Sequence, residues 1–267
     1  MTKAAVTYST YLAIDELLAA QRPLSVGPDG RPEHDELLFI VIHQVYELWF
    51  KQLLHELAEV QRTLEAGESD TTLHLLNRVL KILKTLVAQI DVLETMTPLQ
   101  FLSFRDRLES ASGFQSGQFR EVEAVLGMRD ASASSAQPKG SVARARIEAA
   151  QQRRSVWGSF LWFLTARGHA LADDVLARDV TLPPEPDERV QDVLLGVYRG
   201  DADAALVAER LVDVDEGFQE WRYRHVKMVE RTIGTKRGTG GSAGVEYLRR
   251  TLFQPVFPDL WEIRGRL

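Results

Sequence analysis

The chain has 267 residues, a formal net charge of −6 and no cysteine. The acidic balance argues against nucleic acid or an anionic membrane surface as the main partner, since both attract basic proteins. The absence of cysteine excludes disulfides, thiolate-ligated haem, iron–sulfur clusters and cysteine nucleophiles. The longest apolar runs fall short of the ~18 residues that span a bilayer, and the N-terminus lacks the apolar core of a signal peptide. We therefore expect a cytoplasmic protein without a nucleic-acid or membrane partner.

The first half of the chain is predicted to be helical, because no run of alternating β-branched residues indicates a strand. Prolines and glycines indicate a loop at Pro23–Pro32, and Ser69 or Asp70 can cap the helix that follows Gly67. Thr97 before a proline is typical of an N-cap followed by the first helical turn. The expected helices cover residues 8–20, 34–65, 69–93, 97–108 and 115–126, with a break at 110–113.

The second half continues in helices. Residues 130–142 are small and polar, which indicates a mobile surface connection. An aromatic helix is expected over 155–167, a proline-rich turn at 182–186 and a loop with five glycines at 234–244. Further helices are expected from 188, over 201–233, and over 245–250 and 259–266. The sequence thus predicts an all-α fold, a helical bundle of long helices with short accessory helices, forming a single domain over residues 1–267.

Histidine spacing restricts the possible metal chemistry. None of the six histidines follows a glutamate by three residues, and no His-Glu-x-x-His motif occurs, which excludes the common helical di-iron and zinc sites. A histidine that binds a metal by itself needs a macrocycle such as haem to supply the other ligands. His225 lies at helical spacing from Trp221 and Met228, on the apolar side of its helix. It is either a hydrogen-bonded core histidine or the axial ligand of a haem iron.

A second histidine lies among aromatic residues in an expected long helix. Phe39, His43, Phe50 and either Tyr46 or Glu47 share one helical face. His43 is either a core histidine beside a buried glutamate or part of an aromatic pocket. In such a pocket it could accept a hydrogen bond from a heteroaromatic N–H or pass a proton.

A third pattern joins an aromatic ring to a guanidinium group. Phe101 and Arg105 are four residues apart on one helical face, an arrangement that suits a zwitterionic aromatic ligand. Spacing alone favours a simpler interpretation, in which Arg105 pairs with Glu109 on the helix surface. The residues 112–117 that follow read SGFQSG and add a tight turn with exposed amides.

Together these segments resemble one haem enzyme family, the tryptophan 2,3-dioxygenases. The matching strings are FIVIHQVYELWFKQLLHEL, MTPLQFLSFRDRLESASGFQSGQFR and RHVKMVERTIGTKRGTGGSAGVEYLRRT, which occur in the order found in the family. The resemblance extends over most of the chain from Tyr8 onward and weakens across 65–92 and 126–213.

The resemblance implies a role for each candidate residue. His225 would be the proximal ligand of one haem b per subunit, which is ferrous in the active state. His43 would be the distal histidine that holds the indole N–H. The other substrate contacts would come from Phe39, Phe101, Arg105 and Thr239, while Ser112 and Gly113 would lie against the distal haem face.

The resemblance also implies an activity and an assembly. The enzyme would cleave the indole C2–C3 bond of L-tryptophan with O₂ to give N-formyl-L-kynurenine, the first step of tryptophan catabolism by the kynurenine route. Family members are usually homotetramers in which an N-terminal aromatic segment enters a neighbouring subunit's site. Residues 1–22, with Tyr8, Tyr11 and Leu12, match that segment.

Two other functions remain open at this stage. A relative in the same superfamily could oxygenate a modified tryptophan or a tyrosine in secondary metabolism, by inserting one oxygen atom or two. A haem-binding sensor or carrier would have no turnover, and it would have little use for a carboxylate site built from Arg105 and Thr239.

Overall fold

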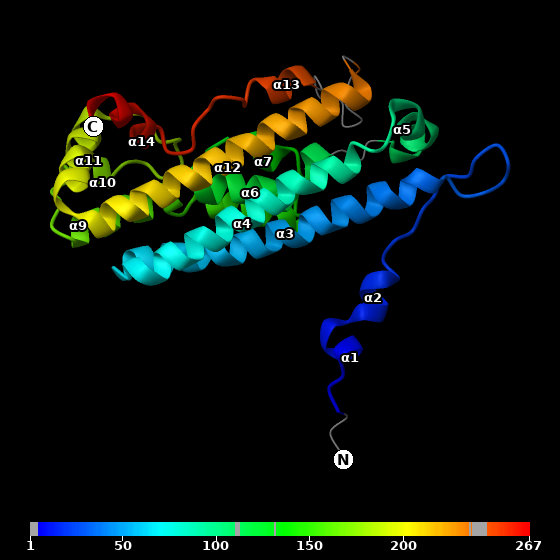
Figure 1. Cartoon of the computed structure of the whole chain (residues 1–267), viewed down its shortest axis with the longest axis horizontal. Helices are drawn as coiled ribbons and strands as arrows, with labels where there is room; N and C mark the ends of the chain where they lie inside the picture. Colours follow the sequence, from blue (N-terminus) through cyan, green and yellow to red (C-terminus); the bar gives the residue numbers. More distant parts are fainter. Residues whose placement is uncertain (1–4, 110–112, 131, 235, 237–244) are drawn as a thin grey trace.

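Three long helices run side by side along the molecule and form its framework (Figure 1). They are α3 (His34–Glu65), α4 (Ser69–Leu93) and α12 (Ala202–Ile233). The computed structural model describes residues 5–109, 113–130, 132–234, 236 and 245–267. Within these ranges helices predominate and the only β-pairing is a single bridge between Val26 and Pro32. The prediction of an all-α fold is confirmed.

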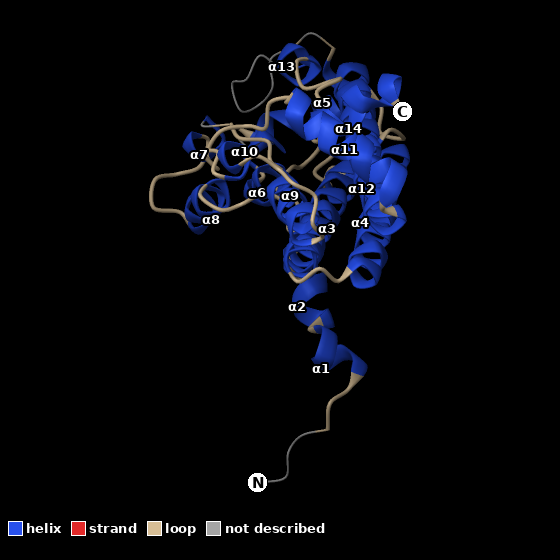
Figure 2. Cartoon of the chain, turned by 90° about the vertical axis from the view of Figure 1, so that its left-hand side faces the viewer, coloured by secondary structure: helices blue, strands red, loops and turns tan. Residues whose placement is uncertain are grey.

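Shorter helices lie along the middle of the framework and at its two ends (Figures 1 and 2). The α-helices are α1 (Tyr8–Leu12), α2 (Ile14–Leu18), α5 (Pro98–Arg105), α6 (Gly117–Leu126), α7 (Ser132–Ser135), α8 (Val142–Gln151), α9 (Val156–Ala166), α10 (Asp173–Leu176), α11 (Glu188–Gly200), α13 (Val245–Arg249) and α14 (Pro258–Glu262). Three 3₁₀ turns cover Asp106–Leu108, Gly113–Gln115 and Ile263–Arg266. In Figure 1, α9, α11 and α14 lie at one end of the long helices and α5 and α13 at the other.

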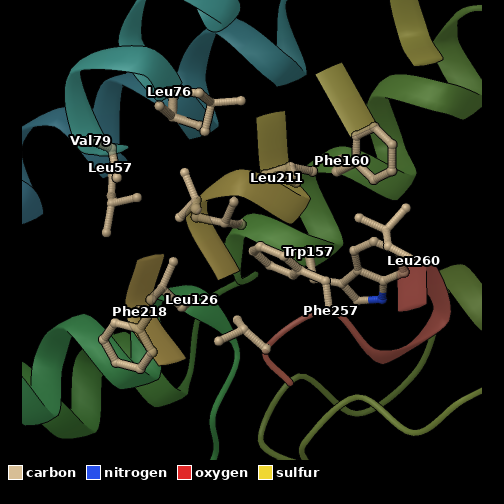
Figure 3. Close-up of a cluster of buried hydrophobic side chains, with 14 of the residues drawn as sticks. Leu57, Leu76, Val79, Leu126, Trp157, Phe160, Leu211, Phe218, Phe257 and Leu260 are labelled. Atoms are coloured by element: carbon tan, nitrogen blue, oxygen red, sulfur yellow. The ribbon is translucent and has the colours of Figure 1, made fainter. Parts of the chain in front are cut away.

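The hydrophobic core lies where the three framework helices pack against shorter helices, among them α6, α9, α11 and α14 (Figure 3). Leu57, Leu76 and Leu211 come from the three framework helices and are at most 1% exposed. Phe160 of α9 and Phe257 just before α14 are fully buried against them. Burying side chains of this size contributes about 1.5–3 kcal/mol each, so this cluster is the main source of stability for the bundle.

Several predicted boundaries agree closely with the structure. Helices α3 and α4 begin and end where the sequence predicted. Helix α5 begins with the expected cap, since the Thr97 side chain and Gln100 form a capping box. The expected cap of α4 is wrong, because Glu68 occupies the N-cap position and neither Ser69 nor Asp70 does.

Two segments differ from the prediction. The helix expected over 8–20 is broken into α1 and α2 by Ala13, whose φ of +49° lies in the left-handed region. The connection over 130–142 is more ordered than expected, because it contains α7 and buries Ala133 and Ser134. Small polar composition indicated a surface loop there, but small side chains also allow close packing against α8.

The N-terminal segment forms an arm that projects away from the bundle (Figures 1 and 2). Helices α1 and α2 contain no buried residue. The base of the arm is held to α3 at two places. The Glu36 carboxylate accepts hydrogen bonds from the backbone N–H groups of Leu24 and Ser25 at 2.7–3.0 Å. The Gln21 amide donates to the Gln44 side chain at 2.5 Å.

One described helix, α3, is long and apolar enough to cross a membrane by length and composition. The same criterion is met by helices in protein cores. Helix α3 packs along α4, α6 and α9 and buries Leu53, Leu57 and Val60 among them.

Candidate active site

A cavity of about 250 Å³ is lined by residues of α3, α4, α5, α6, α12 and α13. Helix α3 lines it with the face that carries Phe39, His43 and Phe50, as the sequence predicted. Phe101 and Arg105 of α5 also line it. The cavity is therefore built from segments that are far apart in the chain.

Aromatic rings form one wall of the cavity. The Phe39 ring lies 4.0 Å from the His43 ring and 5.9 Å from the Phe101 ring, measured between centroids. Behind them, Phe104 packs edge-on against Phe101 at 5.4 Å and is fully buried. This wall is apolar and rigid, and its dimensions suit a flat aromatic ligand.

The hydrogen bond of His43 determines the chemistry of its ring. Its Nδ1 lies 2.7 Å from the backbone carbonyl oxygen of Phe39, so Nδ1 carries the proton and donates it to that oxygen. Nε2 is then an acceptor available to a ligand N–H. Burial lowers the pKa of His43, while the Phe39 carbonyl and the charge of Glu47 act in the opposite direction. The ring is thus neutral near pH 7.

His225 reaches the cavity from α12, as its helical spacing predicted. Burial lowers the pKa of His225 to about 4, with smaller contributions from His43 and Arg120. The imidazole is therefore neutral near pH 7, which is the form that binds metal. Among the described residues, no group of three or more side chains could hold a metal ion, so a metal bound by His225 would need other ligands from a macrocycle.

Arg105 is positioned by its short helix. Helix α5 begins at the Thr97 cap and buries Phe101 and Phe104, which orients the last turn with Arg105 along the cavity. The Ser103 hydroxyl donates to the Glu33 carboxylate at 2.9 Å and so ties α5 to the start of α3. A guanidinium group at the edge of an apolar cavity suits a ligand carboxylate, which it can bind through two parallel hydrogen bonds.

A buried charged cluster beside His225 was not predicted from the sequence. The Glu123 carboxylate accepts hydrogen bonds from Arg120 at 2.6 Å and from Arg222 at 2.8 Å. All three side chains line the cavity and are at most 9% exposed. The i,i+3 spacing of Arg120 and Glu123 was a signal, but it is common on helix surfaces. The contact with Arg222 spans 99 residues and leaves no trace in the local sequence.

A second polar contact that sequence reasoning missed joins α6 to α3 one turn after His43. The Gln118 amide donates at 2.8 Å to both the backbone carbonyl and the carboxylate of Glu47. The Glu47 carboxylate lines the cavity, so its interpretation as a core glutamate beside His43 is only partly correct. This contact fixes the register of α6 against the histidine-bearing part of α3.

The remaining predicted site residues fall into three groups. Gly113 lines the cavity. Ser112 and Thr239 lie outside the described residues. Tyr8 and Tyr11 are more than 70% exposed on the projecting arm, with Leu12 beside them, and none of the three lines the cavity of its own chain.

Comparison with known proteins identifies the family. The sequence model of the family described as "Tryptophan 2,3-dioxygenase" matches residues 1–146 and 189–267. The chain belongs to the tryptophan 2,3-dioxygenase family. A protein named tryptophan 2,3-dioxygenase from Anaeromyxobacter sp. (strain K) is 60% identical over 99% of this chain and 97% of its own length. Proteins of the same name from Herpetosiphon aurantiacus and Bacillus cereus are 54% and 41% identical, over 98% of this chain and 99% and 93% of their own lengths.

The family match and the cavity coincide in the chain. Each described residue that lines the cavity falls within 1–146 or 189–267, the two stretches that the tryptophan 2,3-dioxygenase model matches. The unmatched stretch 147–188 contains α9 and α10, which belong to the opposite end of the bundle. The two stretches that the family model matches therefore include the part of the fold that surrounds the cavity.

Proposed function

We propose that the protein is a haem-dependent dioxygenase that converts L-tryptophan and O₂ into N-formyl-L-kynurenine. The supporting observation is that His225, His43 and Arg105, from three separate segments, line one apolar cavity in a chain of this family. This combination offers an axial ligand, an acceptor for an indole N–H and a carboxylate-binding group in a single space.

The donor set fits a haem. His225 offers a neutral imidazole, and no described cluster of side chains competes as a metal site. Arg120 and Arg222 bring two guanidinium groups to the wall beside it, the groups that best bind the two carboxylates of a haem. His225 would therefore bind the haem iron, and these arginines, which also hold the Glu123 carboxylate, would bind the haem carboxylates. When bound, ferrous haem would supply the site for O₂.

The substrate would be held by four sets of contacts. The rings of Phe39 and Phe101 would enclose the indole and exclude water. His43, whose Nδ1 donates to the Phe39 carbonyl, would accept the indole N–H at Nε2. Arg105 would bind the carboxylate, and Thr239, by family resemblance, would add a contact to the carboxylate or ammonium end.

These contacts serve orientation more than acid–base chemistry. Both atoms of O₂ are incorporated as the C2–C3 bond breaks, and the indole supplies the electrons, so no external reductant is consumed. An indole N–H is a weak acid, so His43 positions the ring rather than removing a proton. Holding the reacting atoms in contact can lower the activation free energy by several kcal/mol.

Product mass tests the proposal. The haem-loaded protein is reduced without oxygen, L-tryptophan and then O₂ are added, and the product is measured by mass spectrometry. A gain of about 32 mass units, matching N-formyl-L-kynurenine, is the expected result. A gain of about 16 would indicate a monooxygenating relative. Bound haem with no product and no tryptophan-induced spectral change would indicate a sensor instead.

We further propose that the arm over residues 1–22 packs on a neighbouring subunit of a homotetramer. Tyr8, Tyr11 and Leu12 are 76%, 78% and 43% exposed in the single chain. Helices α1 and α2 contain no buried residue, so they gain stability only by packing on another surface. Removal of residues 2–20 should lower the mass measured by light scattering. An unchanged tetramer would contradict the role of the arm.

A further inference from the structure

The His225 ring lies nearly parallel to the ring of Trp221 on the same helix. Trp221 lies four residues earlier on α12, so the two side chains share one face. Their ring centroids are 5.1 Å apart and the ring planes differ by only 4°. Offset parallel stacking of this kind favours one orientation of the smaller ring.

Trp221 is itself held by rings from two other helices. Its centroid lies 4.8 Å from Phe119 of α6, 6.2 Å from Phe50 of α3 and 6.4 Å from Tyr46 of α3. The Tyr46 hydroxyl donates to the Leu86 carbonyl of α4 at 2.8 Å, which fixes that ring in turn. Trp221 is 8% exposed. The indole is therefore a rigid surface on which the imidazole rests.

Within the described part of the chain, the orientation of the His225 ring does not come from a hydrogen bond. Among the described residues, neither nitrogen of this ring has a protein hydrogen-bond partner. Histidines that bind metals are usually oriented by a carboxylate or carbonyl that accepts the proton of the second ring nitrogen, and this acceptor also raises the basicity of the ligand. A stacked indole can orient the ring without that second effect.

We infer that Trp221 is the positioning residue of the axial histidine, holding the imidazole plane by stacking in place of a hydrogen-bond acceptor. This inference rests on the proposed assignment of His225 as the haem ligand. It predicts a neutral, weakly basic ligand, which suits O₂ binding better than cleavage of the O–O bond. It also predicts that the face of the Trp221 indole can still bind a free imidazole when the His225 side chain is removed.

Rescue by free imidazole tests the inference. In His225→Gly, imidazole added to the haem-reconstituted protein should bind in the vacated space and restore the haem spectrum. In His225→Gly combined with Trp221→Leu, the Kd for imidazole should rise about two- to twelve-fold, which corresponds to the ~0.5–1.5 kcal/mol of an aromatic contact. Trp221→Phe in the same background should recover part of that affinity.

Phe163→Leu is the matched control. Phe163 is a fully buried aromatic of α9 whose ring lies 6.2 Å from the Phe160 ring, and it does not line the cavity. Combined with His225→Gly, its substitution should change the Kd for imidazole by less than about two-fold. An equal Kd with and without Trp221 would overturn the inference while leaving the ligand assignment intact. Haem binding that is indifferent to both His225→Gly and imidazole would instead refute the assignment of His225, and with it the proposed function.

A vibrational measurement covers the case in which the double variants do not fold. With His225 present, resonance Raman of the ferrous protein reports the iron–histidine stretching band. The band should lie in the range of a neutral imidazole in the parent protein, and should broaden or shift in Trp221→Leu. It should be unchanged in Phe163→Leu. A band that Trp221→Leu leaves unchanged in position and width would overturn the inference.

Discussion

The two ends of the bundle use the same long helices for different purposes. At the end formed by α9, α11 and α14, the side chains of α3, α4 and α12 interlock into a continuous core. Toward the end where α5 and α13 lie, the same helices line a cavity with His43, His225 and Arg105. Stability and chemistry are thus separated along one framework.

Buried polar groups show the same difference. At the packed end, Asp215 is fully buried and accepts hydrogen bonds at 2.9 Å from Val256 N–H, Phe257 N–H and the Trp261 indole. These bonds fasten the C-terminal segment to α12. At the cavity end, the tautomer of His43 leaves Nε2 as an acceptor for a ligand. Substitutions at the packed end should therefore change the free energy of unfolding, and substitutions at the cavity end should change haem binding or turnover.

The largest expected effect is loss of haem in His225→Ala. Removing the only proposed axial ligand should abolish stable haem binding and turnover, while the remote core keeps the protein folded. The haem absorbance band and the activity report the loss, and circular dichroism reports the retained helices. Full haem occupancy with an unchanged spectrum would refute the ligand assignment.

The opposite result is expected for Phe160→Ala at the packed end. The Phe160 ring is fully buried and lies 5.6 Å from the Trp157 ring. Its removal should lower the free energy of unfolding by about 3–5 kcal/mol and Tm by roughly 6–20 °C, with kcat per bound haem unchanged. Phe253→Ala is the control. Phe253 is 87% exposed, so its removal should change the free energy of unfolding by less than about 0.5 kcal/mol. A loss of kcat in Phe160→Ala would show that the two ends are coupled.

Arg105→Ala sharpens the comparison from the cavity side. If Arg105 binds the substrate carboxylate in a water-poor cavity, its removal should cost about 2–5 kcal/mol of transition-state stabilisation. The kcat/KM for L-tryptophan should then fall roughly 30- to 5000-fold. Tm should change little. Arg107→Ala, an exposed arginine two residues later, should leave kcat/KM within about two-fold. Equal losses with tryptamine, which lacks the carboxylate, would contradict the role.

Sequence patterns predicted most of the framework, because its long helices have a strong local signal. The bounds of α3 follow from apolar periodicity that ends near Gly67, and α5 begins at the Thr97 cap. The break at Ala13 was not predicted, since alanine rarely adopts a positive φ. The short helix α10 was also missed, because four residues give too little periodicity to detect.

Within the site, the sequence predicted part of the cavity lining, with Phe39, His43, Phe101, Arg105, Gly113 and His225, but not what holds these residues. His43, Arg105 and His225 could be identified because each lies on one helix face within a segment of recognisable sequence. The cluster of Arg222 with Glu123 depends on tertiary packing between distant segments. The parallel stacking of Trp221 on His225 depends on side-chain rotamers, which spacing on a helix permits but does not specify.

The smallest expected effect concerns His43, and it distinguishes positioning from catalysis. His43→Ala should keep measurable turnover, with kcat/KM reduced about two- to twelve-fold, the size of one neutral hydrogen bond. Complete loss of turnover with haem still bound would contradict the positioning role.

The pH profile of the parent protein tests the same residue independently. The neutral imidazole is the form that accepts the indole N–H, and burial lowers the pKa of His43 below its ordinary 6.5 despite the nearby Glu47 carboxylate. The ring therefore stays neutral as the pH falls through 6.5, so kcat/KM should be flat there and decline only at lower pH. In His43→Ala that decline should disappear. An acid limb centred at or above the ordinary value in the parent protein would mean that the ring is solvated, and that it does not form part of an enclosed indole pocket.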